Sequence, residues 1–224
     1  MRASPPPGAR TSRGGSRDLR VAHGEDTRRR VVARALEIAG AEGLEALTIG
    51  RLADDLAMSK AGVFGAFGSK EGLQLAVVEA AREDFVARVA APAMAAPEGL
   101  PRLESLCAAW LTWARSCPGG CFFSSAASEF DGRPGAVRDR VATSVAEWLE
   151  ALTAAIEDAR RLGHLGAEVD AAQLAFELHA LELGGNAAFQ LFGDRAALER
   201  AERAIGTRLA AARAPALRAR RRRG

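Results

Sequence analysis

The chain has 224 residues, of which 48% are hydrophobic and 26% charged, and its formal net charge is +3. This length allows one large domain or two small ones with a real apolar core, and no apolar run approaches the roughly 18 residues of a membrane-spanning helix. The first residues lack the apolar segment of a signal peptide, so we expect a cytoplasmic protein with three reduced cysteines and no membrane partner.

The positive charge is concentrated at the two ends. Residues 1–25 carry a net +3 and residues 213–224 a net +6, which leaves a net −6 for residues 26–212. The N-terminal stretch is rich in Ser, Pro, Gly and Arg and cannot bury enough apolar surface to fold. We therefore predict a disordered basic tail at each end, able to add only nonspecific attraction to phosphate.

Residues 26–90 are predicted to form a first domain around two short helices and a tight turn. Thr48 can cap a helix whose apolar residues follow the i, i+3, i+4, i+7 spacing, and this period breaks at residues 57–58. Ser59 can cap a second helix and Ser69 a third. The second helix is predicted to turn Val63 and Phe67 inward and to expose Lys60, Ala61, Gly62, Phe64 and Gly65. Such a small outer face fits a DNA major groove about 12 Å wide.

Residues 26–80 resemble the helix-turn-helix domain of TetR-family transcriptional regulators. The family pattern is matched by Ser59, Phe67, Ser69, Lys70 and Glu71, at the family's spacing. The resemblance implies that double-stranded DNA is the partner and that the second short helix reads it. By the same resemblance, DNA contacts are expected from Thr48, Ser59, Lys60, Ala61, Gly62, Phe64, Gly65 and Lys70.

Three positions depart from the usual family pattern. Members commonly have Tyr, often His, and Pro where this chain has Phe64, Ala66 and Gly68. Because Phe64 and Ala66 offer no hydrogen bond to a phosphate, contact with the DNA backbone should depend more on Thr48, Lys60, Lys70 and the helix N-termini.

The rest of the chain predicts further helices and no strand. The stretch 90–97, rich in Ala and Pro, is expected to end one helix and to separate the first domain from a second at residues 98–212. We predict an all-α fold of about nine helices. The segment from Gly119 to Cys121 and the segment from Glu129 to Gly135 resemble a C-terminal domain found in TetR-like regulators. This resemblance implies a domain that senses a ligand and dimerises.

Aromatic residues are denser in the second domain than in the first. Apolar cavities between bundle helices commonly bind small molecules, so a small, mainly apolar effector is expected there. The candidate ligand residues are Trp110, Trp113, Phe122, Phe123, Phe130, Trp148, Phe176, His179 and Phe189. His179 or Glu182 would be its polar anchor. The alternative is that these aromatic side chains are plain core.

The last two predicted helices are candidates for the interface of a homodimer. The resemblance implies that this pair forms a four-helix bundle with its symmetry mate. The interface candidates are Leu174, Leu178, Leu181, Gly184, Gly185, Ala188, Leu198, Ile205 and Leu209. The two adjacent glycines cost helix stability, roughly 1 kcal/mol each relative to Ala. A close helix would compensate, and that helix could belong to the partner or to the same chain.

No set of residues predicts a catalytic site, a metal site or a cofactor. His179 lies three residues before Glu182, but no metal-ligand set surrounds the pair. Cys117 and Cys121 flank Pro-Gly-Gly near the start of a helix, where a redox switch is one interpretation and a structural role the other. The sequence thus indicates a dimeric regulator, most simply a repressor released by its ligand. The rival is a helical ligand-binding or interaction protein that has lost specific DNA binding.

Overall fold

The computed structural model describes residues 15–214, and for residues 15–23 the backbone alone. Its α-helices are α1 (Gly15–Glu42), α2 (Ile49–Asp55), α3 (Lys60–Phe67), α4 (Lys70–Phe85), α5 (Ala91–Met94), α6 (Leu100–Ser116), α7 (Phe122–Phe130), α8 (Ala136–Arg161), α9 (Ala171–Phe192) and α10 (Ala196–Ala212). A 3-10 helix, η1 (Leu44–Ala46), joins α1 to α2. The described residues contain no strand, and none of their helices is long and apolar enough to cross a membrane.

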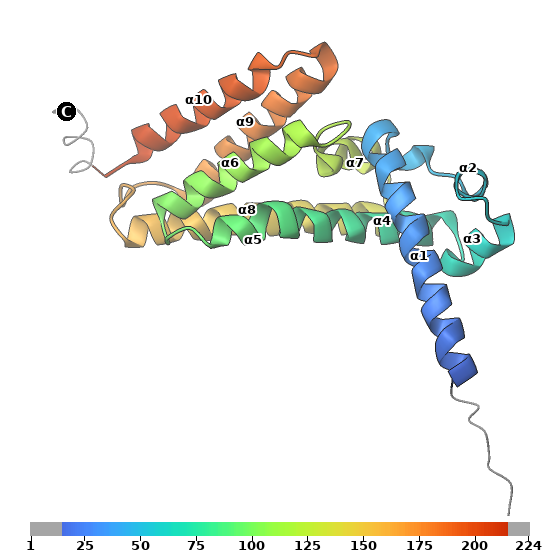
Figure 1. The fold of residues 1–224 in the computed structure, drawn as a ribbon. Helices are drawn as coiled ribbons and strands as arrows, with labels where there is room; N and C mark the ends of the chain where they lie inside the picture. Colours follow the sequence, from blue (N-terminus) through green and yellow to red (C-terminus); the bar gives the residue numbers. More distant parts are fainter. Residues whose placement is uncertain (1–14, 215–224) are drawn as a thin grey trace, which may run out of the picture.

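The helices form a small head and a larger bundle (Figure 1). α1, α2 and α3 make the head together with the start of α4, and α4 then runs into the bundle beside α8. α6 and α7 also pack on α8, and α9 and α10 lie against each other along the outer side. Buried apolar residues continue from Val31 in α1 to Ala212 in α10, so the head and the bundle share one core.

The first helix begins earlier than the sequence predicted. α1 starts at Gly15, so residues 15–25, which we expected in a disordered tail, are helical. Val31 and Ala35 fix the later turns in the core, with no exposed surface. Extending a helix that is already anchored needs only propagation and no new nucleus. Residues 1–14, the rest of that predicted tail, lie outside the described residues.

The predicted C-terminal tail also begins too early. Arg213 forms an isolated β-bridge with Leu165, and its guanidinium donates to the Glu104 carboxylate at 2.9 Å. Arg213 therefore joins the end of α10 to α6 and to the loop before α9. Its position in an arginine-rich segment of the sequence does not indicate this role. Residues 215–224 lie outside the described residues.

Helix α4 does not stop at the stretch rich in Ala and Pro. It continues through a π-helical segment at Val86–Ala90 into α5, where Pro92 lies in the first turn. The Ala91 N–H bonds to the Val86 carbonyl, five residues back. This wider turn shifts the hydrogen-bond register where a proline would otherwise break it. The boundary expected at 90–97 falls partly inside this helix. When α4 and α5 are counted as one continuous helix, the described part of the chain has nine α-helices.

Candidate functional site

Three short polar side chains begin the helices of the head, as their sequence positions predicted. Thr48 accepts a hydrogen bond from the Arg51 N–H at 3.1 Å and caps α2. Ser59 caps α3 and Ser69 caps α4 in the same way, at 3.0 and 2.9 Å. Each serine or threonine oxygen satisfies one N–H that the helix cannot pair internally. These caps fix where α2, α3 and α4 start and therefore how the turn between α2 and α3 is shaped.

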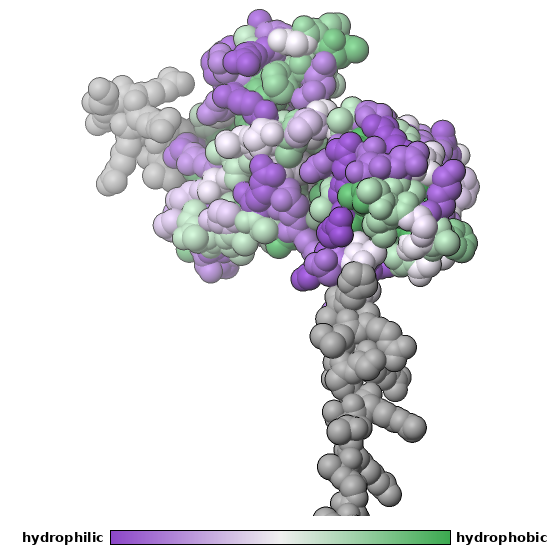
Figure 2. Space-filling model, turned by 45° about the vertical axis from the view of Figure 1, so that its right-hand side comes forward, coloured by the Kyte–Doolittle hydropathy of each residue, from purple (hydrophilic) through white to green (hydrophobic). Residues whose placement is uncertain are grey.

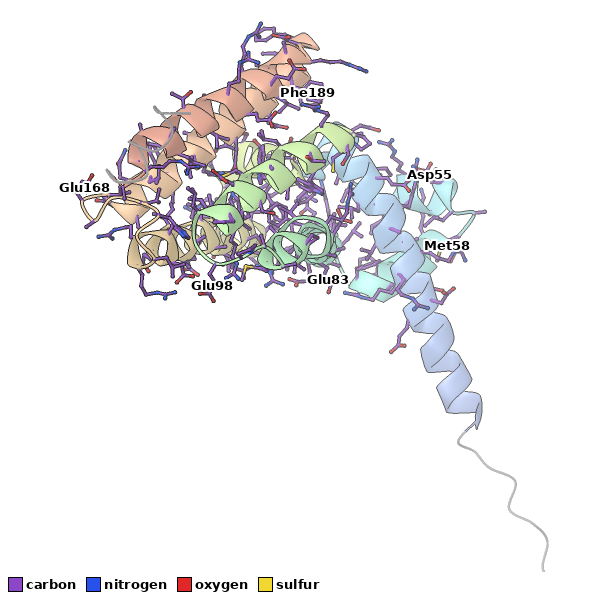
Figure 3. The ribbon with its side chains drawn as sticks, turned by 60° about the vertical axis from the view of Figure 1, so that its left-hand side comes forward. Asp55, Met58, Glu83, Glu98, Glu168 and Phe189 are labelled. Atoms are coloured by element: carbon purple, nitrogen blue, oxygen red, sulfur yellow. The ribbon has the colours of Figure 1, made fainter. Side chains whose placement is uncertain are left out.

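The outer face of α3 is open and nearly bare. Val63 is fully buried beneath the helix. The exposed residues are Lys60, Ala61, Gly62, Phe64 and Gly65, as predicted. A Cβ at Gly65 would have nothing within 4 Å, so a partner can approach the helix backbone closely there. Figure 3 shows Asp55 and Met58, near the turn before α3, on the other side of α1 from the bundle.

Helix α1 braces α2 and α3 through arginines that sequence reasoning missed. Arg28 donates to the Ala66 carbonyl at the end of α3 at 2.6 Å, and its guanidinium lies 4.7 Å from the centre of the Phe67 ring. Arg34 pairs with Asp55 at 2.8 Å. An arginine near the end of a helix also favours the negative pole of its dipole. The orientation of α3 is therefore set from α1, across 38 residues of sequence.

Lys70 lies against the turn that precedes α2. Its Nζ donates to the Glu45 carbonyl oxygen at 2.9 Å and lies 3.5 Å from the Glu45 carboxylate. A hydrogen bond from Gln74 lowers the pKa of Glu45, and the charges of Lys70 and Arg133 lower it further. An ammonium group has three donors, so Lys70 can organise this turn and still donate to a phosphate.

A cavity of about 240 Å³ lies between α4, α6, α7, α8 and α9. Its wall is mainly apolar, with a few hydroxyls, one imidazole and the ion-paired side chains of Arg82 and Glu147. Of the predicted ligand residues, the cavity brings together Trp110, Phe123, Trp148 and His179. Sequence reasoning missed the contribution of α4, whose Phe85 stands edge-on to Trp148 at 5.2 Å between ring centres. The other residues that line it include Val86, Ser124, Ala127, Ser128, Ser144, Ala151 and Leu183.

The remaining predicted ligand residues lie elsewhere. Trp113 and Phe122 are buried and line a separate pocket of about 220 Å³ beside α1, and Phe130 is buried in the core. Phe176 is 64% exposed on the outer side of α9. Phe189 lies near the tip of the α9–α10 pair (Figure 3), half-buried beside Arg115, Arg195 and Glu199. Their periodicity showed that these rings lie on apolar faces but could not show which faces enclose a cavity.

A buried carboxylate stands behind the cavity wall. Glu182 has no exposed surface, and its Oε2 accepts the Trp148 indole N–H at 3.1 Å and lies 3.2 Å from Nδ1 of His179. Its Oε1 has no hydrogen-bond partner among the described residues. Burial raises the pKa of the Glu182 carboxyl, and the contacts with His179 and Trp148 oppose part of that effect. Through Nδ1, Glu182 orients the His179 ring, which lines the cavity.

Most of the apolar residues predicted for a dimer interface are buried within one chain. Leu174, Leu178, Leu198, Ile205 and Leu209 are at most 4% exposed. A Cβ at Gly185 would lie 2.6 Å from the Ala201 side chain, so this glycine serves the crossing of α9 with α10. These six residues already pack within one chain, and their place in a dimer interface stays a prediction. Helical spacing marks an apolar stripe without saying which neighbour covers it.

An apolar surface remains on the outer side of this helix pair. Leu181, Gly184 and Ala188 line a shallow groove between α9 and α10. Leu191 and Phe192, at the end of α9, are 77% and 74% exposed. Figure 2 shows apolar colour at this end of the molecule.

The two flanking cysteines are free thiols in buried or half-buried positions. Burial raises the pKa of Cys117, and it raises the pKa of Cys121 to about 12. A thiol must ionise to act as a nucleophile, so this environment favours the structural interpretation over the redox switch. No cluster of three His, Cys, Asp or Glu side chains that could hold a metal occurs in the part of the chain that the structure describes.

Comparisons with known proteins agree with this architecture. The family model "Bacterial regulatory proteins, tetR family" matches residues 31–77, and the model "Tetracyclin repressor-like, C-terminal domain" matches residues 99–205. No curated protein matches the chain. A TetR transcriptional regulator from Chloroflexus aurantiacus J-10-FL is 26% identical, with a TM-score of 0.77 over 83% of this chain and 95% of that one.

Two more distant structures show the same fold. A TetR-family regulator from Cytophaga hutchinsonii has a TM-score of 0.77 at 16% identity, over 85% of this chain and 96% of that one. AibR, solved with isovaleryl coenzyme A and operator DNA, has a TM-score of 0.64 at 18% identity, over 80% of this chain and 95% of that one. The two family models match the head and the bundle separately, in the order in which the chain builds them. The chain therefore belongs to the TetR family of DNA-binding transcriptional regulators.

Proposed function

We propose that this protein is a homodimeric repressor that binds a palindromic operator and releases it when a small molecule occupies the cavity. The observation that carries the proposal is the presence, in one chain, of a bare outer face on α3 and a mainly apolar cavity in the bundle. The solved complex of AibR with a coenzyme A thioester and operator DNA supports this combination of partners within the same fold.

The DNA-binding surface consists of α3 and the starts of α2 and α4. Lys60, Ala61, Gly62 and Gly65 would meet base edges, because they are the exposed residues of α3 with small or donating side chains. Thr48, Ser59 and Lys70 would contact phosphates, together with the N-termini of their helices. Phe64, at 53% exposure, would pack on sugar or on a thymine methyl.

The ligand is proposed to be small, mainly apolar and uncharged. Arg82 and Glu147, which line the cavity, pair with each other at 2.6 Å, and Glu182 contacts His179. Each charged side chain at the cavity therefore already has an oppositely charged or ionisable neighbour. A ring between Trp110, Phe123 and Trp148 would bury its faces, and His179 would provide one hydrogen bond.

The homodimer would form through the outer side of α9 and α10. Phe176 and Leu191 are exposed at opposite ends of α9, and the groove at Gly184 and Ala188 lies between them. An apolar surface along a whole helix is typical of a protein interface. A dimer that binds a palindromic operator needs one α3 in each of two successive major grooves, about 34–36 Å apart.

Selection of genomic DNA fragments with the purified protein tests the proposal. Enrichment of one palindromic sequence with half-sites about one helical turn apart is the expected result. Uniform, weak and strongly salt-dependent retention would instead support the rival, a ligand-binding protein of the same fold without sequence-specific DNA binding. Uncharged aromatic compounds can then be screened for release of the selected operator. An Ala151→Phe variant, whose cavity is partly filled, provides the matched control for binding.

A further inference from the structure

The turn between α1 and α2 is capped by a residue of the ligand-sensing domain. Gly43, at the cap position of η1, has no side chain with which to bind the first N–H groups. The side chain of Glu129 in α7 caps these N–H groups instead. The Leu44 N–H donates to Oε1 at 3.0 Å and the Glu45 N–H donates to Oε2 at 2.8 Å. Both carboxylate oxygens are thus used, in the charge-assisted form that makes the strongest backbone hydrogen bonds.

Gly43 is adapted to this contact from the other side. Its φ is +95°, a conformation that favours glycine, and a Cβ there would collide with the Glu129 carboxylate. The glycine and the glutamate, 86 positions apart in the sequence, therefore form one unit.

The capped turn lies next to the residues that we assign to DNA binding. Glu45 holds Lys70 through its carbonyl oxygen, and Thr48, which begins α2, follows η1 by two residues. A displacement of η1 would therefore move the start of α2 and loosen the anchor of Lys70. It would also carry α3, which packs on α2.

The opposite face of α7 lines the cavity. Ser124, Ala127 and Ser128 belong to its wall, and Ser128 immediately precedes Glu129. The N-terminal end of α7 is fixed to α9, because the Cys121 N–H donates to Oδ1 of Asn186 at 3.1 Å. The C-terminal end of this helix of nine residues is tied to the head by Glu129. A molecule that fills the cavity and displaces the wall formed by α7 would therefore act directly on that contact.

We propose that Glu129 is the positioning residue through which occupation of the cavity controls the DNA-binding helices. With the cavity empty, Glu129 caps η1 and holds α2 and Lys70 in the DNA-binding arrangement. With the cavity filled, α7 shifts, the cap is lost and operator affinity falls. The proposal rests on the proposed function, since it assigns the route between the two sites of that repressor.

A double-mutant cycle tests this route without a known ligand. Ala151→Phe fills the cavity from α8 and stands in for the ligand, and Glu129→Gln keeps the size of the side chain but leaves one acceptor for two donors. Operator affinity is measured by fluorescence anisotropy for the unmodified protein, both single variants and the double variant. We expect Ala151→Phe to weaken operator binding about tenfold alone, within the usual range of allosteric coupling, and less than about twofold beside Glu129→Gln.

Control variants separate coupling from general damage to the fold. Glu157→Gln changes an exposed carboxylate on α8 and should leave both the affinity and the effect of Ala151→Phe unchanged. Ala151→Leu repeats the cycle with a smaller occupant. Hydrogen exchange in Ala151→Phe should accelerate more at the Leu44 and Glu45 amides than at the amides of α10, whereas a general loss of stability would accelerate both.

Multiplicative effects of the two substitutions, or an Ala151→Phe variant that binds the operator normally, would overturn the inference. If instead the unmodified protein selects no operator, the proposed function itself fails. If the protein selects an operator but the effects of the two substitutions multiply, only the role of Glu129 is refuted.

Discussion

The recognition face of α3 and the cavity in the bundle place their functional groups in opposite environments. On α3, Ala61 and Gly65 are exposed, and nothing in the described chain approaches the position of a Gly65 side chain. In the bundle, Glu182 has no exposed surface and is bound by Trp148 and His179. A substitution on α3 should therefore change binding and leave folding intact, whereas a substitution around the cavity should change both.

The largest expected effect is on α3. Gly65→Glu adds bulk and negative charge where DNA would approach, and it should lower operator affinity about 100-fold, or about 2.7 kcal/mol. The unfolding temperature should not fall, because glycine within a helix is about 1 kcal/mol less favourable than Ala, and Glu is also a better helix former than Gly. Affinity by anisotropy and unfolding by circular dichroism measure the two effects. Gly132→Glu, at an exposed loop position that is equally open, is the control. It should change neither the operator affinity nor the unfolding temperature. Normal operator binding by Gly65→Glu would remove α3 from the interface.

On the outer side of α9, as on α3, a substitution should change binding to a partner and leave folding largely intact. Phe176→Asp should weaken dimerisation by about 30-fold or more, as for an interface hot spot, with little loss of monomer stability because this ring is mostly exposed. Leu198→Ala is the contrasting change: this buried side chain should contribute about 2–5 kcal/mol to the free energy of unfolding. Sedimentation velocity and chemical denaturation distinguish them. An unchanged dimer in Phe176→Asp would mean that another surface pairs the subunits.

The buried carboxyl of Glu182, behind the cavity wall, should make stability depend on pH. Burial raises the pKa of Glu182 above its ordinary 4.5, so above that pH the folded chain retains a proton that the unfolded chain releases. Stability is therefore lost as pH rises from about 4.5 to the raised pKa, and Glu182→Gln abolishes this loss. In denaturation across a pH series, the variant should gain stability relative to the parent as pH rises through this window. The exposed Glu157→Gln serves as the control. A difference that does not change with pH would show that Glu182 ionises normally.

The smallest effect is expected at the cysteines. Because burial raises the pKa of both Cys117 and Cys121, neither thiol should react readily with peroxide. Cys117→Ser should alter operator affinity less than about twofold, and peroxide should leave the operator complex intact in gel-shift assays. Reversible release by peroxide, lost in serine variants at either position, would instead establish a redox sensor.

Much of the head could be predicted from the sequence because its signals are local. Thr48, Ser59 and Ser69 each cap a helix within three residues, and Val63 is buried as the spacing predicted. The sequence predicted that the helix would end near Pro92, because a proline usually ends a helix. In the structure a π-helical turn at Val86–Ala90 allows the helix to continue past it. The contribution of Phe85 and Val86 to the cavity was missed for another reason: their spacing marks an apolar face of the helix but does not show that this face meets the second domain.

Most helices, the caps of α2, α3 and α4 and the family could be predicted from local sequence, since these depend on residues within a few positions of one another. Which apolar stripes face the core, the cavity or solvent depends on how the helices pack. Leu198, Trp148 and Phe176 each fit the apolar spacing of a helix and differ in their neighbours. The same is true of the contact between Glu129 and Gly43, which joins residues 86 positions apart in the sequence. Contacts of that kind depend on how whole helices pack, and no local pattern records them.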